Sequence, residues 1–184
     1  APIDSGQKLG MRIYFIVHES FEAPGAYASW AQSRGNAVSY SKVYLGEALR
    51  ESANEIDFFI IMGGPQSPAT TKAECPHFDA AAEISLIANR VAANRTVIGT
   101  CLGSHLLAKR WAPDSTIARK GDQQVPDFSI IDGLVNEKFA HFGSWLDVGH
   151  WHNDMPGLRP DTKIIAYSEG CLQQIVEYSK RVYG

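Results

Sequence analysis

The sequence has 184 residues and a mass of 20.2 kDa, a length typical of one domain that can bury a substantial core. Hydrophobic residues make up 45% and charged residues 20%, which excludes a wholly disordered chain. The formal net charge of −3 gives no basic surface for nucleic acid, and no apolar run approaches the ~18–20 residues of a membrane-spanning helix. Three cysteines (Cys75, Cys101 and Cys171) form neither a disulfide framework nor a zinc-binding pattern, so we expect a reduced, cytoplasmic protein.

The first ten residues differ in composition and periodicity from the rest of the chain. Residues 1–10 are polar, contain glycine and show no periodicity, whereas Met11 opens a strand-like run. They have no basic region followed by an apolar one, so they do not form a signal peptide. We interpret residues 1–10 as an added leader or a short native arm, and residues 11–184 as a single domain.

Strand and helix patterns alternate along the first part of the domain. Continuous apolar runs predict buried strands, and apolar residues at helical spacing predict amphipathic helices. In chain order we expect a strand over 12–18, a helix over 24–34, a strand over 38–43, a helical turn over 46–53, a strand over 57–62, a helix over 78–94, a strand over 96–100 and a helix over 102–111. This order predicts an α/β fold of three layers, flavodoxin-like and doubly wound, with a mostly parallel sheet and helices on both faces.

After Pro113 the pattern changes to short β-prone segments separated by Gly and Pro. These segments are 116–118, 128–131, 146–150, 163–167 and 173–178. They predict a small antiparallel edge of the sheet in the C-terminal part, with little helix.

The pentapeptide Gly99-Thr100-Cys101-Leu102-Gly103 lies between a predicted strand and a predicted helix. A glycine on each side of a central nucleophile permits the tight strand-to-helix turn of a nucleophile elbow. Cys101 would then stand at a helix N-terminus, where the dipole favours a thiolate, and the Leu102 N–H would face a developing oxyanion. The alternative is a buried, inert cysteine, which is the usual state of a free thiol.

A second turn, Met62-Gly63-Gly64-Pro65, follows the preceding strand. Two glycines at the end of a strand allow the backbone to direct an N–H group towards a ligand. The turn can therefore supply the second donor of an oxyanion hole. By itself it is better explained as an ordinary tight turn, but beside the cysteine elbow the functional interpretation is the better one.

These two turns, followed by His150-Trp151-His152-Asn153-Asp154, resemble the class I glutamine amidotransferase family. The motifs stand in family order, and the resemblance runs from about Met11 to Gly184. The resemblance is strongest to stand-alone members of the family that are similar to the glutaminase of GMP synthase. The family uses a Cys-His-Glu triad: the cysteine attacks the side-chain amide of glutamine, ammonia leaves, and water hydrolyses the thioester to glutamate.

The resemblance implies a role for each matching residue. Cys101 would be the nucleophile, with the N–H groups of Leu102 and Gly64 as the oxyanion hole. Asn153 and Met155 would line the pocket for the glutamine head group. The substrate would be glutamine or a related small amide, a synthase partner would receive the ammonia, and the chemistry needs no metal or organic cofactor. The sequence does not indicate an oligomeric state.

Two residues depart from the family pattern near the expected pocket. His105 stands where the family usually has a substrate-binding Gln, and imidazole is shorter and titratable. It lies one helical turn beyond Cys101 and could reach the same pocket. Asn153 replaces the Gly of the third motif, and Asn is the residue other than Gly that best tolerates positive φ.

The most serious departure is the catalytic His-x-Glu, which the resemblance places about four residues after Gly184. No such pair occurs in residues 150–184, and without it the thiol lacks a base. We therefore expect either a truncated form of a longer enzyme, which we favour, or a natural non-catalytic relative with a binding or regulatory role. A peptidase-like cysteine hydrolase on a similar sheet is disfavoured, because such relatives carry His where this chain has Leu102.

The remaining histidines and cysteines have no assigned role in this hypothesis. His150 and His152 share one face of a predicted strand, but no motif places a third metal ligand beside them, so we expect no metal. His18, His77 and His141 are expected to be packed or surface residues, and Cys75 and Cys171 ordinary thiols.

Overall fold

The computed structural model describes residues 10–111, 127–131, 137–149, 151–152, 154–168 and 171–184. Its helices are α1 (Ala26–Ser33), α2 (Ala80–Ala92) and α3 (Leu102–Trp111), with short 3-10 helices η1 (Val43–Leu45), η2 (Ala53–Glu55) and η3 (Glu137–Phe142). Its strands are β1 (Arg12–Val17), β2 (Ala37–Lys42), β3 (Phe58–Ile61), β4 (Thr96–Gly99), β5 (Asp127–Ile131), β6 (Trp145–Val148), β7 (Lys163–Tyr167), β8 (Ile175–Ser179) and β9 (Val182–Tyr183).

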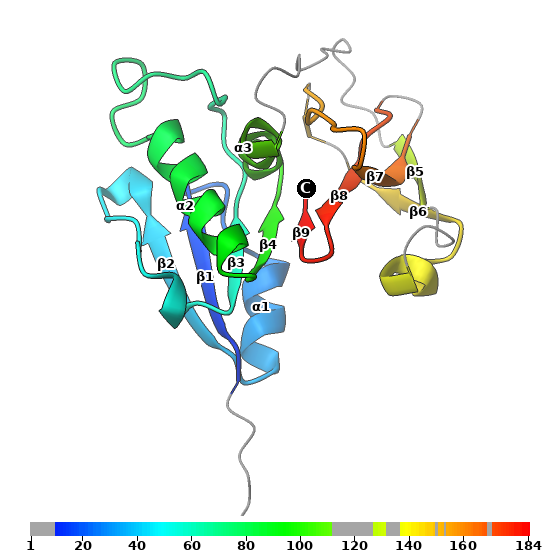
Figure 1. Ribbon diagram of the computed structural model, residues 1–184, viewed down its shortest axis with the longest axis horizontal. Helices are drawn as coiled ribbons and strands as arrows, with labels where there is room; N and C mark the ends of the chain where they lie inside the picture. Colours follow the sequence, from blue (N-terminus) through cyan, green and yellow to red (C-terminus); the bar gives the residue numbers. More distant parts are fainter. Residues whose placement is uncertain (1–9, 112–126, 132–136, 150, 153, 169–170) are drawn as a thin grey trace, which may run out of the picture.

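The described strands form one sheet in the order β2-β1-β3-β4-β9-β8-β7-β5-β6 (Figure 1). From β2 to β9 neighbouring strands are parallel, and from β9 to β6 they are antiparallel. The predicted α/β class, with a parallel sheet and antiparallel strands in the C-terminal part, is confirmed. The parallel strands bring the ends of β1, β3 and β4 to one edge of the sheet, where ligands bind in open α/β folds.

Alternate residues of the parallel strands enter two separate cores. On one face Tyr14, Phe59 and Ile61 pack with residues of α2 and α3, including Leu86 and Leu106. On the other face Ile13, Phe15 and Ile60 pack with Ala31 of α1. Because successive side chains of a strand point to opposite faces, a strand buried on both faces needs the continuous apolar runs that the sequence contains.

The helical turn predicted over 46–53 is wrong. Residues 46–52 connect η1 to η2, and Gly46 ends η1 with a left-handed φ of 77°. The fully buried guanidinium of Arg90 donates hydrogen bonds to the carbonyl groups of Arg50 and Glu51, so a distant side chain takes up acceptors that a helix would use. The β-prone segment 116–118 lies outside the described residues.

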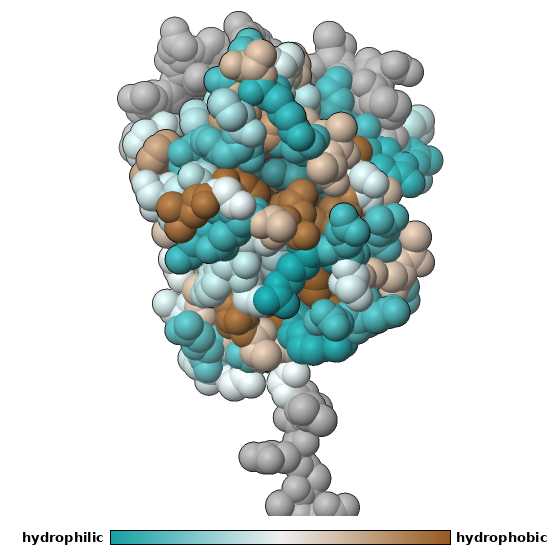
Figure 2. Space-filling model, turned by 90° about the vertical axis from the view of Figure 1, so that its left-hand side faces the viewer, coloured by the Kyte–Doolittle hydropathy of each residue, from teal (hydrophilic) through white to brown (hydrophobic). Residues whose placement is uncertain are grey.

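On the face shown in Figure 2, apolar residues occur as small patches between hydrophilic ones. Individual exposed apolar residues are normal on a protein surface. Among the described helices, none combines the length and the hydropathy required to cross a membrane.

Candidate active site

Cys101 lies at the turn between β4 and α3, as the nucleophile-elbow hypothesis requires. Its φ of 53° is in the left-handed region, which is unfavourable for a residue with a side chain. The close approach of the flanking glycines makes this turn possible: a Cβ on Gly103 would collide with the main-chain carbonyl group of Ile61, and a Cβ on Gly99 with that of Gly103. The turn thus directs the thiol away from the sheet and into a cavity.

Two backbone N–H groups converge on the Cys101 thiol. They belong to Leu102, at the start of α3, and to Gly64, in the turn after β3. Burial raises the pKa of the Cys101 thiol. The two backbone N–H groups lower this pKa, whereas the carboxylates of Glu22 and Asp154 raise it further. A pair of N–H groups aimed at one point beside a nucleophile is the arrangement that stabilises an oxyanion.

Behind the Gly64 N–H lies a fully buried histidine. The Nδ1 atom of His18 lies 2.9 Å from the carbonyl oxygen of Gly63, and its Nε2 atom lies 2.9 Å from Oε2 of Glu83. Burial lowers the pKa of His18, but the hydrogen bond and charge of Glu83, with backbone carbonyls, outweigh it and raise the pKa above its ordinary value. His18 and Glu83 are therefore paired beneath the glycine turn, and this pairing favours the protonated form of the imidazole.

The thiol of Cys101 opens into a cavity of about 590 Å³. The cavity lies where the parallel and antiparallel parts of the sheet meet, and its charged lining residues are Glu22, Lys138 and Asp154. This volume suits a small molecule. Because the lining contains both acidic and basic side chains, it suits a zwitterion. Its lining comprises Glu22, Tyr27, Ile98, Gly99, Thr100, Cys101, Ser104, His105, Lys138, Phe139, Gly149, Trp151, His152, Asp154, Pro156, Gln173, Gln174, Ile175, Tyr183 and Gly184.

Of the predicted substrate-binding residues, His105 lines this cavity. Met155 is half-buried and lies outside the cavity lining, and Asn153 lies outside the described residues. Burial lowers the pKa of His105, and Asp154 partly opposes this through its charge and its backbone. His152 lies beside it, with Nδ1 3.0 Å from the Asp154 carbonyl oxygen and Nε2 3.0 Å from Oε1 of Gln174.

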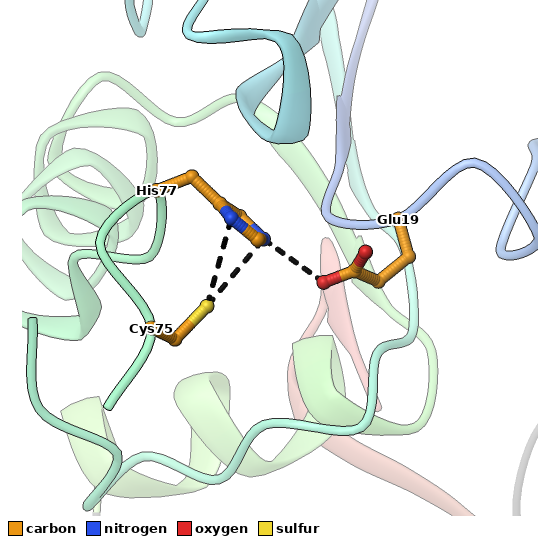
Figure 3. Close-up of side chains that lie close together, drawn as sticks. All are labelled: Glu19, Cys75 and His77. Carbon is orange, nitrogen blue, oxygen red and sulfur yellow. Dashed lines mark hydrogen bonds and ion pairs between the residues drawn. The ribbon is translucent and has the colours of Figure 1, made fainter.

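In the described part of the chain, one further group brings potential metal-binding atoms together (Figure 3). The donor atoms of Glu19, Cys75 and His77 all lie within 4.8 Å of one another, and these donor types could hold a cation such as zinc. His77 Nε2 lies 2.9 Å from Glu19 Oε1 and 3.4 Å from Cys75 Sγ. The Gln66 side-chain amide also donates to Glu19 and Cys75, so this cluster connects the end of β1 to the segment before α2.

Comparison with known proteins shows the family of the chain. Residues 30–184 match the model of the family described as glutamine amidotransferase class-I. The glutamine amidotransferase-like protein YfeJ of Salmonella typhimurium is 50% identical over 177 residues, covering 95% of this chain and 73% of that protein. The chain belongs to the class I glutamine amidotransferase family.

Solved structures show the same fold. The crystal structure of SMU.1228c is 39% identical, with a TM-score of 0.89 over 94% of this chain and 74% of that one. A glutamine amidotransferase from Thermotoga maritima has a TM-score of 0.83 at 23% identity, over 95% of this chain and 74% of that one.

Three residues of this region, His18, Glu83 and Glu22, were not predicted to belong to it. His18 was expected to be a packed or surface histidine, and it is indeed buried. A signal was nevertheless present, because His18 follows a continuous apolar strand at the edge of the sheet where sites are placed. Its partner Glu83 lies 65 residues further along the chain, on an otherwise ordinary amphipathic helix, and no local pattern connects the two.

Proposed function

We propose that this chain carries a glutaminase site in which Cys101 hydrolyses the side-chain amide of glutamine. The observation that carries the proposal is the convergence of the Leu102 and Gly64 N–H groups on the thiol of a cysteine at positive φ. Membership of the amidotransferase family supports the same chemistry.

In the proposed reaction the Cys101 sulfur attacks the carboxamide carbon of glutamine. The carboxamide oxygen becomes an oxyanion and accepts hydrogen bonds from Gly64 and Leu102. As this intermediate collapses, the C–N bond breaks, the nitrogen takes up a proton and leaves as ammonia, and a thioester remains. Water then attacks the thioester, releasing glutamate and the thiol. The opposite charges of Glu22 and Lys138 in the cavity suit the α-ammonium and α-carboxylate groups of the substrate.

The reaction also needs a base for the thiol, since burial raises its pKa and keeps it protonated near neutral pH. We propose that a His-x-Glu pair following Gly184 in the complete protein supplies it. β9 runs parallel to β4, with Ile98 opposite Tyr183, and Gly184 lines the cavity. A continuation of β9 would therefore advance alongside the elbow that holds Cys101.

Ammonia release from glutamine tests this function. We compare the 184-residue chain, its Cys101→Ala variant, and a form extended by the segment that follows in the natural protein. We expect release from the extended form, its loss with Cys101→Ala, and little release from the 184-residue chain. Release by the 184-residue chain that depends on Cys101 would instead make His105 or His152 the base. No release from any form would contradict the glutaminase proposal.

A non-catalytic role as a binding or regulatory protein is the second candidate. It is favoured by the carboxylates of Glu22 and Asp154, which raise the pKa of Cys101 and so oppose thiolate formation. Glutamine binding without ammonia release, measured by calorimetry on the extended form, would support it. For an active enzyme, we propose that a synthase on another chain receives the ammonia.

A further inference from the structure

We propose that the buried pair His18–Glu83 is a positioning device for the oxyanion hole, holding the Gly63–Gly64 peptide with its N–H towards Cys101. This inference rests on the proposed glutaminase function. His18 and Glu83 do not touch the cavity; they would act through the peptide group that lies between His18 and the nucleophile.

The Gly63–Gly64 peptide group connects His18 to the oxyanion hole. The described peptides are all trans, and in a trans peptide the C=O and N–H groups point in opposite directions. His18 Nδ1 lies 2.9 Å from the carbonyl oxygen of Gly63, while the N–H of the same peptide group, which belongs to Gly64, lies on the side of the Cys101 thiol and lowers its pKa. Fixing the carbonyl on His18 therefore directs the N–H to the opposite side, where the oxyanion would form.

The peptide group needs this hydrogen bond from His18 because it lies between two glycines. Glycine populates both signs of φ, so this peptide group could rotate and turn its carbonyl towards the nucleophile. Substitution of either glycine is restricted by the surroundings: a Cβ on Gly63 would lie 2.9 Å from Glu22 Oε2, and a Cβ on Gly64 would lie 3.2 Å from His18 Cβ. The rigidity that the oxyanion hole requires must then come from outside the turn.

The charge of the pair adds a second effect. In its protonated form the His18 ring donates to both of its partners, the Gly63 carbonyl and the Glu83 carboxylate, and is a cation. A cation that donates to the Gly63 carbonyl polarises the peptide and makes the Gly64 N–H a stronger donor. Glu83 compensates this charge in an environment where neither residue is more than 1% exposed.

Stability alone does not account for the pair. Two charges buried together lose their hydration, and apolar residues of similar volume are often at least as stabilising. The ring is also held against rotation, since it packs edge-on against Phe78 with 5.7 Å between ring centroids. The pair is therefore rigid and charged, which are the properties that an oxyanion hole needs from its support.

The experiment replaces the pair without leaving a buried charge unpaired. In the double variant His18→Leu/Glu83→Met the donor to Gly63 is lost, whereas in His18→Asn/Glu83→Met the side-chain amide nitrogen can replace Nδ1. The readout is the pH dependence of Cys101 alkylation by iodoacetamide, followed by mass spectrometry of the Cys101 peptide. The charged groups facing the thiol, Glu22 and Asp154, and the imidazoles of His105 and His152 stay unchanged.

Loss of the Gly64 hydrogen bond should move the alkylation profile to higher pH and slow alkylation at pH 7 about tenfold. His18→Asn/Glu83→Met should restore most of the rate. The matched control is Tyr14→Phe, which removes another buried hydrogen bond of β1, the 2.8 Å contact with Ser41, and should leave the profile unchanged. An unchanged profile in His18→Leu/Glu83→Met, or an equal shift in Tyr14→Phe, would overturn the proposal.

Ammonia release by the extended form gives a second readout. Removal of the positioning pair should lower kcat about 100-fold with little change in KM, as for loss of one oxyanion donor. If no form releases ammonia, the glutaminase proposal fails, but the alkylation profile still decides whether His18 and Glu83 position the peptide.

Discussion

His18 and Glu83 form an ion pair with 2.9 Å between Nε2 and Oε2, on elements that meet only in the folded protein. His18 directly follows β1 and Glu83 lies in the first turn of α2. Because the pKa of His18 is raised in the folded state, the folded protein holds its proton more tightly than the unfolded chain does. This pair should therefore connect stability to pH.

The sign of that dependence follows from the raised pKa. The contribution of His18 to stability is fully present below its unfolded pKa of about 6.5 and is lost as pH rises through the higher folded pKa. We expect the free energy of unfolding, measured with urea between pH 6 and 9, to fall with pH more steeply in the wild type than in His18→Leu/Glu83→Met. Parallel curves for the two proteins would contradict this.

Gly103 of the elbow should not tolerate a side chain. A Cβ at this position would collide with the main chain of Ile61, and backbone cannot move aside as a flexible side chain can. We expect Gly103→Ala to lower the free energy of unfolding by about 1–3 kcal/mol. Gly149→Ala is the control, since a Cβ there meets no atom within 4 Å. Equal urea midpoints for both variants would show that the elbow can relax.

Asp79 caps α2, the helix that carries Glu83. Its carboxylate accepts a hydrogen bond from the Ala82 N–H at 2.9 Å and also pairs with Lys72. Asp79→Ala should cost about 0.5–2 kcal/mol of stability, whereas Asp79→Asn keeps the cap and should retain most of it. Thermal unfolding followed by circular dichroism compares the two variants. A loss of stability in Asp79→Asn as large as that in Asp79→Ala would show that the Lys72 ion pair, and not the cap, stabilises the helix.

His105 departs from the glutamine that the family usually carries, and it lines the cavity beside Cys101. An amide both donates and accepts hydrogen bonds, so His105→Gln should bind glutamine about 3- to 10-fold more tightly. Calorimetry in a Cys101→Ala background measures binding without turnover. Weaker binding in His105→Gln would mean that the imidazole itself contacts the substrate.

The helix and strand pattern up to Trp111 was largely predictable from the sequence. Apolar runs and amphipathic spacing record burial directly, so β1, β3, α2 and β4 fall close to their expected positions. The predicted turn over 46–53 was wrong because Arg90, a distant residue of α2, bonds to the carbonyl groups of that segment. A pattern confined to neighbouring residues holds no information about such a contact.

The elbow and its glycines could be predicted from residue types alone, because a tight strand-to-helix turn leaves a local signature in the sequence. The sequence also led to the family, which the comparisons show. The residues that meet at that turn became known only from the folded structure. The parallel sheet brings the ends of β1, β3 and β4 together, so that the Gly63–Gly64 peptide lies between His18 and Cys101. These interactions depend on directions in space between residues distant in the chain, and no sequence spacing records those directions.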